Sequence, residues 1–214
     1  MIFGTPTIVT TGLVAHLDAA NAISYPRTGA TWTDLSGNGN NSTLVSSPTF
    51  DPNNQGCIQF NGVNQYTSVP ISTTVGSINF WFYYNAGTKT KTVMGNSSAN
   101  VMYIAGGGGF MHWWNGSGDY SFGAWPAGAG DTSQWINICA TYTSAASNKL
   151  YANGVLSAAT TTYTLNKATP YYVAGTILGY QNCKFALIST YNRELNDKEV
   201  FQNYNALKNR FGLI

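Results

Sequence analysis

The chain has 214 residues, of which 43% are hydrophobic and only 8% are charged, and its formal net charge is +2. A typical soluble domain carries about 25% charged residues, so Asn, Thr, Ser and Gly supply most of the polarity here. The small net charge without a basic cluster argues against a nucleic-acid partner, and no apolar run approaches the roughly 18 residues of a membrane-spanning helix. The length suits one domain that buries its own core.

The first third of the chain combines short strand patterns with turn-rich segments. Residues 1–11 are apolar and β-branched without an evident strand partner, and we expect an N-terminal arm that orders on a neighbouring molecule. A strand is expected over residues 11–17, and a loop over residues 32–41, where Gly and Asn favour tight turns. Residues 57–69 predict a β-hairpin with Asn61-Gly62 at its turn.

The middle of the chain is dominated by strand patterns. Residues 78–84, I-N-F-W-F-Y-Y, are nearly all apolar, so we expect a central strand covered on both faces. Residues 135–142 alternate apolar and polar side chains, and residues 149–156 place Asn153-Gly154 between apolar arms, which is the strongest short signal for a hairpin. Shorter strands are expected at residues 92–94, 102–104, 110–114, 120–122, 171–174 and 183–191. These patterns indicate antiparallel sheets.

One helix is expected near the C-terminal end. Asn196 is followed three residues later by Glu199, which is a capping-box-like start, and apolar residues follow at helical spacing. Gly212 is the expected stop. Many short strands with one helix predict an all-β fold: a two-sheet antiparallel jelly-roll sandwich with one short C-terminal helix packed on its edge.

Five segments, taken in order along the chain, carry a family resemblance. They are G-L-V-A-H-L-D-A at residues 12–19, W-T-D-L-S-G-N-G-N at 32–40, C-I-Q-F-N-G-V-N-Q-Y-T-S-V at 57–69, W-I-N-I-C-A-T-Y with its K-L-Y-A-N-G hairpin at 135–154, and F-A-L-I-S-T-Y-N-R-E-L-N-D-K-E-V-F-Q-N-Y at 185–204. Together they resemble the concanavalin A-like, laminin-G-like jelly-roll superfamily. The resemblance implies a single such domain over residues 12–214.

The ends of the chain resemble standalone versions of this domain in structural proteins of tailed bacteriophages. The markers are the opening G-L-V-A-H-L-D-A-A-N, the closing R-E-L-N-D-K-E-V-F-Q-N-Y-N-A-L-K-N-R-F-G-L and the lack of a signal-peptide pattern. The resemblance implies a non-enzymatic virion protein that is assembled in the host cytoplasm. Its leading role would be a capsid decoration or cement protein docked on the major capsid protein. The alternative is a carbohydrate-binding adhesin domain of a tail fibre or baseplate that recognises host surface glycan.

The expected partners follow from these two roles. They are other virion proteins of the head or tail, a second copy of the chain, or a host glycan, with no nucleic acid and no membrane. Cys57, Cys139 and Cys183 are odd in number and lie in apolar surroundings, so free core thiols are expected. These thiols and the missing signal peptide disfavour a third interpretation, a cellular laminin-G-like module that binds calcium.

Catalysis is not expected. Glycoside hydrolysis needs two positioned carboxylates, and no pair alternates along one strand as it does in the superfamily's glucanases. Glu194, Asp197 and Glu199 gather at the helix start, where negative charge complements the helix dipole. His16 and His112 lie in no Ser- or Cys-based catalytic motif, so we expect no catalytic residue.

One loop is rich in oxygen ligands. Asp34, Asn38 and Asn40 carry the side chains that calcium prefers, but the loop lacks a second carboxylate and a terminal Glu. We therefore expect no metal ligand and no cofactor, and calcium at these three residues is the one exception that the sequence leaves open.

The best binding candidate is the glycine-rich stretch 105–126. Sugars stack on aromatic rings, and Asn and Asp bind sugar hydroxyls. Trp113 and Trp114 must point to opposite faces of a strand, so at most one of them shares a surface with His112. A protein interface has the same composition, and both interpretations stay open. The candidate residues are His112, Trp113, Trp114, Asn115, Asp119, Tyr120 and Trp125.

Overall fold

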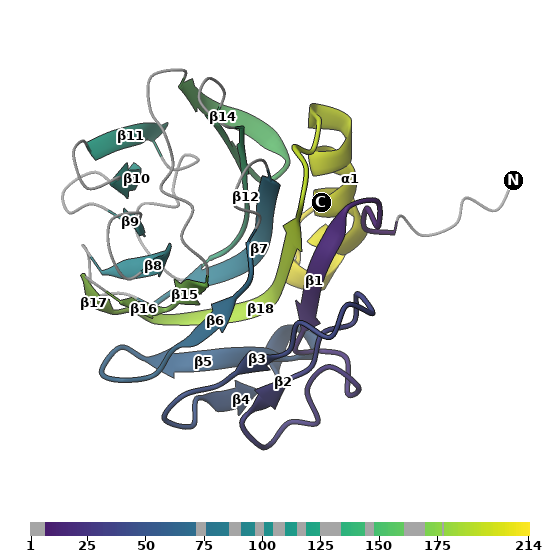
Figure 1. Ribbon diagram of the computed structural model, residues 1–214, viewed down its shortest axis with the longest axis vertical. Coiled ribbons are helices and arrows are strands. Elements are labelled where there is room, and N and C mark those ends of the chain that lie inside the picture. The colour runs from purple at the N-terminus through teal and green to yellow at the C-terminus, as the bar shows by residue number, and fades with distance from the viewer. Residues whose placement is uncertain are drawn as a thin grey trace, which may run out of the picture.

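The computed structural model shows a mainly β fold with antiparallel sheets and one short C-terminal helix, as the sequence predicts (Figure 1). The two main sheets pack face to face, and the larger one curves around the smaller. The structure describes residues 7–71, 76–85, 91–96, 101–104, 110–114, 119–124, 134–143, 148–160, 170–176 and 178–214.

The larger sheet has eight strands over the described residues, in the order β14-β13-β12-β7-β18-β5-β4, with β1 paired to β18. Its central strand, β7, is buried at every position except Tyr83, which confirms the prediction of a strand covered on both faces. The bounds are β1 (Leu13–Asp18), β4 (Thr49–Asp51), β5 (Cys57–Asn61), β7 (Gly76–Tyr84), β12 (Trp135–Tyr142), β13 (Asn148–Ala152), β14 (Val155–Thr160) and β18 (Asn182–Tyr191).

The smaller sheet has six strands in the described part of the chain, in the order β11-β10-β9-β8-β15-β6. They are β6 (Thr67–Val69), β8 (Thr92–Gly95), β9 (Val101–Ile104), β10 (Phe110–Trp114), β11 (Asp119–Ala124) and β15 (Tyr171–Val173). Two short ladders join β2 (Thr31–Trp32) to β3 (Ser42–Thr43) and β16 (Gly175–Thr176) to β17 (Gly179–Tyr180).

The strongest hairpin prediction is confirmed. Strands β13 and β14 pair antiparallel, and Asn153 (φ 49°) and Gly154 (φ 76°) both lie in the left-handed region that a type I′ turn requires. The turn is tied to the neighbouring strand, because the Asn153 side-chain oxygen accepts the backbone N–H of Asn137 at 3.0 Å.

The second predicted hairpin, over residues 57–69, is wrong. Strand β5 pairs with β4 and β18 in the larger sheet, whereas β6 pairs with β15 in the smaller sheet. Asn61 remains in its strand and only Gly62 takes a positive φ, of 73°. The chain therefore crosses from one sheet to the other. The Gln65 side chain fixes this crossing, because its Oε1 accepts the Asn61 N–H at 2.8 Å.

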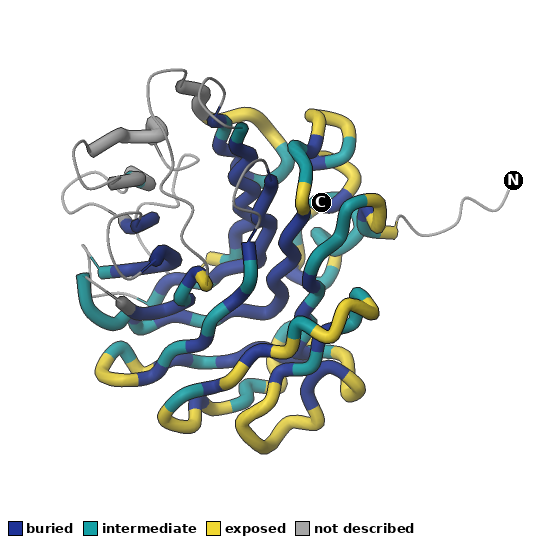
Figure 2. The backbone as a smooth tube through the Cα atoms, in the orientation of Figure 1, coloured by how far each residue is buried: buried dark blue, intermediate teal, exposed yellow. Residues whose placement is uncertain are grey.

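The main core is built from strands of both sheets, and Figure 2 shows buried residues concentrated along the strands of the larger sheet. Aromatic rings of the larger sheet dominate its centre: Phe80 packs against Phe82 and Phe185, with ring centroids 6.4 and 5.5 Å away. All three cysteines are buried and free, as expected. Cys183 lies in this core, whereas Cys57 and Cys139 lie in two smaller clusters on the other face of the larger sheet.

The C-terminal helix covers that other face. Helix α1 (Asp197–Leu207) continues as a 3-10 turn, η2 (Lys208–Phe211), and Trp81 of the central strand stacks on Tyr204 and Phe211 at 5.8 and 4.1 Å. The expectation that the helix packs on the sheet's edge is therefore wrong. An aromatic central strand presents large rings on both faces, and the outer one needs cover.

The helix boundaries agree with the sequence. The Asn196 side chain accepts the N–H groups of Lys198 and Glu199, and the Glu199 carboxylate accepts the N–H of Asn196, which completes a capping box. Gly212 ends the helical segment in a left-handed conformation, φ 71°, after η2. The one α-helix of the described residues is too short and too polar to span a bilayer.

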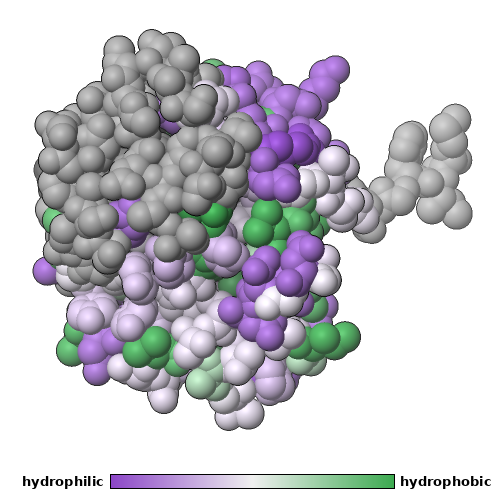
Figure 3. Space-filling model, viewed as in Figure 1, coloured by the Kyte–Doolittle hydropathy of each residue, from purple (hydrophilic) through white to green (hydrophobic). Residues whose placement is uncertain are grey.

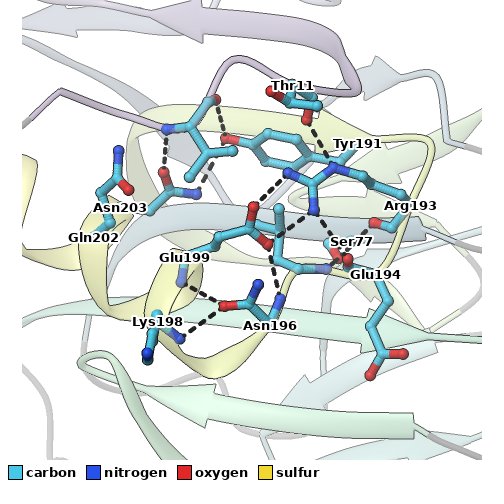
Figure 4. Close-up of polar contacts among 12 residues, drawn as sticks. Thr11, Ser77, Tyr191, Arg193, Glu194, Asn196, Lys198, Glu199, Gln202 and Asn203 are labelled. Atoms are coloured by element: carbon cyan, nitrogen blue, oxygen red, sulfur yellow. Dashed lines mark hydrogen bonds and ion pairs between the residues drawn. The ribbon is translucent and has the colours of Figure 1, made fainter.

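Residues 7–11 of the expected N-terminal arm lie against this helix (Figure 4). The Val9 N–H donates to Asn203 Oδ1 at 2.8 Å, and the Tyr191 hydroxyl donates to the Val9 carbonyl at 3.0 Å. Arg193 Nε donates to the Thr11 carbonyl at 3.0 Å. Val9 itself is buried, so this part of the arm packs on the domain.

Candidate functional site

The predicted aromatic stretch forms one edge of the smaller sheet. Strand β10 lies between β9 and the edge strand β11. The register places His112 opposite Ser121, Trp113 opposite Tyr120 and Trp114 opposite Asp119. The His112 ring lies 5.2 Å from that of Tyr103 on β9.

The structure thus brings five of the seven candidates into adjacent rows of one sheet edge: His112, Trp113, Trp114, Asp119 and Tyr120. Asn115 and Trp125 lie outside the described residues. Four of the five placed candidates are known by backbone position alone: Trp113, Trp114, Asp119 and Tyr120. Binding of glycan or protein at this edge stays a prediction.

The oxygen-rich loop is closed by its own hydrogen bonds. Both oxygens of Asp34 are acceptors: Oδ1 takes the N–H groups of His16 and Ser36 at 2.8 Å each, and Oδ2 takes the Ser36 hydroxyl at 2.7 Å and the Asn40 N–H at 3.0 Å. The amide nitrogens of Asn38 and Asn40 donate to the carbonyl of Val14 at 3.2 and 2.7 Å. These contacts fasten the loop to β1, and they occupy the Asp34 oxygens that a cation would need.

The electrostatics of this loop follow from those contacts. Burial alone would raise the pKa of Asp34, but the hydrogen bonds from Ser36, His16 and Asn40 outweigh it and hold the pKa below its ordinary value. Burial lowers the pKa of His16 despite the nearby charges of Asp18 and Asp34. No group of three or more His, Cys, Asp and Glu side chains that could hold a metal ion occurs among the described residues.

The acidic cluster at the helix start has structural partners, as expected. Glu199 forms a two-pronged ion pair with Arg193, at 2.8 and 2.7 Å (Figure 4). Asp197 accepts the Tyr151 hydroxyl at 2.6 Å, and Glu194 lies 3.3 Å from Lys149. A hollow of about 570 Å³ opens beside these residues, and the carboxylates that line it, Glu194 and Asp197, already have partners.

A different hollow has the lining of a recognition site. On the face drawn in Figure 3, hydrophobic residues outside the grey atoms form small groups separated by hydrophilic ones. A groove of about 670 Å³ is lined by Tyr25, residues 27–30 and residues 47–50. We call it the edge groove, because Phe50 belongs to β4, the last strand of the larger sheet.

One wall of the edge groove is the loop that follows Tyr25. The buried Tyr25 ring packs against Phe50 with centroids 6.1 Å apart, and its hydroxyl donates to the Gly29 carbonyl at 3.1 Å. Burial raises the pKa of Tyr25, so the hydroxyl stays protonated and donates. The Ala30 carbonyl accepts the Leu44 N–H at 2.7 Å. The loop is therefore held at both ends.

The other wall runs into β4. Ser46 and Ser47 both take left-handed conformations, with φ 58° and 53°, and the Gln65 amide donates to their carbonyls at 3.1 and 2.9 Å. The Phe50 ring is partly exposed and rests on Gly56, where an added Cβ would lie 2.8 Å from the ring. Both walls are thus held in place by hydrogen bonds and ring packing.

The floor of the groove combines a ring, a cation and hydroxyls. The Arg27 guanidinium carbon lies 5.6 Å from the centroid of the Phe50 ring. Thr28, Ser47 and Thr49 are exposed around it. In the part of the chain that the structure describes, β4 pairs with β5 alone, so the other side of its backbone takes part in no strand pairing there.

Sequence reasoning missed this groove. Its two walls, P-R-T-G-A at residues 26–30 and S-S-P-T-F at residues 46–50, lie about 20 residues apart and meet only through the fold. Each is a turn-like cluster of Pro, Ser, Thr and Gly beside one aromatic residue. A turn-like cluster beside an aromatic residue was the available signal for a binding site. The density of Trp and Gly at residues 105–126 was a stronger signal of the same kind.

Solved structures share the fold at low sequence identity. A sialidase of Trypanosoma rangeli is 16% identical, with a TM-score of 0.72 over 95% of this chain and 34% of its own. Domain 4 of AbnA, a GH43 extracellular arabinanase from Geobacillus stearothermophilus solved in complex with arabinotriose, is 16% identical, with a TM-score of 0.69 over 90% of this chain and 98% of its own. The receptor binding domain of a botulinum neurotoxin C/D mosaic serotype is 15% identical, with a TM-score of 0.70 over 92% of this chain and 51% of its own.

The chain spans about a third of the length of the sialidase chains that it matches. No curated protein sequence matches it significantly. A family model described as the concanavalin A-like lectin/glucanases superfamily matches residues 59–201, which is about two thirds of the chain, and its laminin-G-like type agrees with the resemblance noted in the sequence. The chain therefore belongs to the laminin-G-like family of the concanavalin A-like lectin/glucanases superfamily.

Proposed function

We propose that the protein is a non-catalytic carbohydrate-binding domain and that it binds saccharide in the edge groove. The observation that carries the proposal is the partly exposed ring of Phe50 at the floor of a groove rimmed by hydroxyl side chains. A pyranose presents a C–H face that packs on such a ring, and its hydroxyls need donors and acceptors around the rim.

The rigidity of the groove supports this role. The Tyr25 hydroxyl and the Gln65 amide hold the two walls from behind. A site whose walls are fixed before binding loses little conformational entropy when the ligand enters. Exposed Thr28, Ser47 and Thr49 supply short side chains that bind sugar hydroxyls without a large ordering cost.

The non-catalytic part of the proposal rests on the carboxylates. Asp18, Asp51 and Glu199 form ion pairs with Arg210, Lys184 and Arg193. Each other carboxylate whose side chain is described also has a partner that positions structure. Carboxylates occupied in this way are poorly placed to act as acid and base on a glycosidic bond.

The structural neighbours support saccharide recognition as well. Among them are the arabinanase domain solved with arabinotriose and the receptor binding domain of the neurotoxin. The first of these carries a bound saccharide, and saccharide binding by this chain is our extension of that likeness.

A soluble glycan array, followed by calorimetry on each hit, tests the proposal. We expect Phe50→Leu, which keeps apolar volume without a flat ring, to weaken binding at least about tenfold. Phe201→Ala is the matched control, because it removes an exposed ring from α1, outside the groove. The absence of any saccharide ligand, or unchanged binding by Phe50→Leu, would reject the assignment.

The same array separates the groove from the sheet edge predicted by the sequence. Trp113→Ala and Trp114→Ala alter β10, which belongs to the other sheet. If these variants lose binding while Phe50→Leu keeps it, the saccharide site lies at β10 and β11. The edge groove predicts the opposite pattern.

A second candidate function is the capsid decoration protein expected from the sequence. The observation in its favour is an apolar surface at the tip of the β13–β14 hairpin and the adjoining helix. Val155, Leu156 and Phe201 are 65%, 47% and 49% exposed, and Phe201 lies against Gly154 of the turn. Exposed apolar groups of this kind mark protein contacts.

Virion fractionation tests this second function and the expected location together. Mass spectrometry of separated heads and tails should find the protein on heads, in capsid-multiple copies. A Leu156→Asp variant should lose binding to empty capsids, whereas Phe50→Leu should keep it. Presence in tails alone would instead support the adhesin interpretation, and absence from virions would reject both phage roles.

A further inference from the structure

We infer that the edge groove selects saccharides that carry a carboxylate group and that Arg27 binds this group. The inference rests on the proposed function, because it names the class of saccharide for the same groove. It goes beyond that function in predicting a charge preference and the residue that sets it.

The charge of the groove points to an anion. Arg27 is the single charged residue of its lining and is exposed. The acidic residues of the neighbouring strands are already neutralised: Asp18 lies 2.8 Å from Arg210, and Asp51 lies 2.6 Å from Lys184. Within the described residues no carboxylate pairs with Arg27, so its positive charge is available to a ligand.

The position of the guanidinium suits a carboxylate. It lies over the Phe50 ring, with its central carbon 5.6 Å from the ring centroid. Attraction to the ring restrains the side chain, and a guanidinium held in this way still has N–H donors for a ligand. Two parallel N–H groups match the two oxygens of a carboxylate. A sugar ring beside Phe50 would therefore place its carboxylate within reach of Arg27.

The backbone at Arg27 adds an independent observation. Its φ of 71° lies in the left-handed region, which is unfavourable for a residue with a Cβ and favours Gly. Strained positions of this kind gather at ligand-binding sites. An arginine at such a position is compatible with a side-chain role that Gly cannot fill.

Paired ligands make the test sharp. The probes are uronic-acid oligosaccharides and the same oligosaccharides with each carboxyl reduced to a hydroxymethyl group, measured by calorimetry at two salt concentrations. We expect the acidic form to bind at least about tenfold more tightly, and this preference to shrink as salt rises.

The variants assign the preference to one side chain. Arg27→Gln should abolish the preference by weakening binding of the acidic oligosaccharide, and Arg27→Lys should retain part of the preference. Lys198→Gln is the control, since it removes one exposed cation outside the groove and changes the net charge equally. An unaltered preference in Arg27→Gln would overturn the role of Arg27.

The outcomes also separate this inference from the proposed function. Equal binding of the acidic and reduced forms would overturn the charge preference while carbohydrate binding stands. Failure of the protein to bind either form, together with an empty glycan array, would overturn both.

Discussion

Arg210 and Asp18 form an ion pair that joins the last helical turn to the first strand of the larger sheet. Nη1 of Arg210 lies 2.8 Å from Oδ1 of Asp18, across 192 positions of sequence. The same guanidinium donates to the carbonyls of Asn54 and Gly56 at 2.7 and 2.6 Å. The arginine is 5% exposed. This contact closes the C-terminal segment on the sheet and holds the turn that carries Gly56 under Phe50.

Replacing Arg210 by Met is expected to lower the free energy of unfolding by about 3 kcal/mol, because it leaves the partly buried Asp18 without its cation and two carbonyls without this donor. Arg210→Lys keeps the positive charge but cannot make all three guanidinium hydrogen bonds, so it should lose less free energy of unfolding than Arg210→Met. Urea denaturation gives both values. Lys149→Met is the control: its pair with Glu194 is about 30% exposed on each side, so its loss should stay under about 1 kcal/mol. Equal losses in Arg210→Met and Lys149→Met would contradict this account.

The two Asn-Gly turns show what local sequence can predict. At Asn153-Gly154 both residues take positive φ, and the flanking strands pair with each other. At Asn61-Gly62 only the glycine does, and the flanking strands enter different sheets. The second turn differs because its two flanking strands have distant partners: β5 pairs with β18, and β6 pairs with β15. No local pattern specifies such long-range pairing.

The candidate sites divide in the same way. The capping box is a four-residue pattern, and it was predictable because Asn196 and Glu199 act within one helical turn. The edge groove was not, because Arg27 meets Phe50 only when β4 reaches the end of the larger sheet. The sequence shows the residue types that suit a sugar, and the fold decides which of them share a surface.

Residues 7–10 are expected to contribute to stability. Deleting residues 1–10 should lower the free energy of unfolding by about 2 kcal/mol, because it exposes the surface that Val9 covers and removes its two hydrogen bonds. Deleting residues 1–6 removes none of these contacts and serves as the control. Urea denaturation of both forms measures the difference. If both deletions leave stability unchanged, residues 7–10 act only as the assembly arm expected from the sequence.

The acid stability of the protein is expected to depend on Asp34. Its pKa is lowered in the folded state, so folding is favoured above the unfolded value near 4, and this contribution is lost as the pH falls through the folded value. Hydrogen bonds and ion pairs also lower the pKa of Asp51 and Glu199, so their contributions are lost in the same acid range.

Asp34→Asn should therefore destabilise the protein by about 1–2 kcal/mol at neutral pH and flatten the decline below about pH 4. The Asn amide cannot accept from both Ser36 and Asn40, whose donors face Oδ2. Denaturation curves recorded from neutral pH down to the acid range measure both effects. Glu194→Gln, which alters a partly exposed pair, should leave the slope intact. A slope in Asp34→Asn that equals that of the unaltered protein would contradict the role of Asp34.

The cysteines are expected to report the order in which the two faces of the larger sheet open. Burial raises the pKa of Cys57 to about 12 and also raises the pKa of Cys139 and of Cys183, and only a thiolate attacks a disulfide reagent. In native buffer near pH 8 we expect no thiol to react with such a reagent. As denaturant is added, Cys57 and Cys139 should react before Cys183. The first two lie in the outer-face clusters that α1, η2 and residue Val9 help to cover, whereas Cys183 lies between the sheets.

Mass mapping of the labelled peptides measures the order in which the three cysteines react. Single Cys→Ser variants assign each labelling rate to one cysteine. Simultaneous labelling of all three would mean that the helix and the sandwich unfold as one unit.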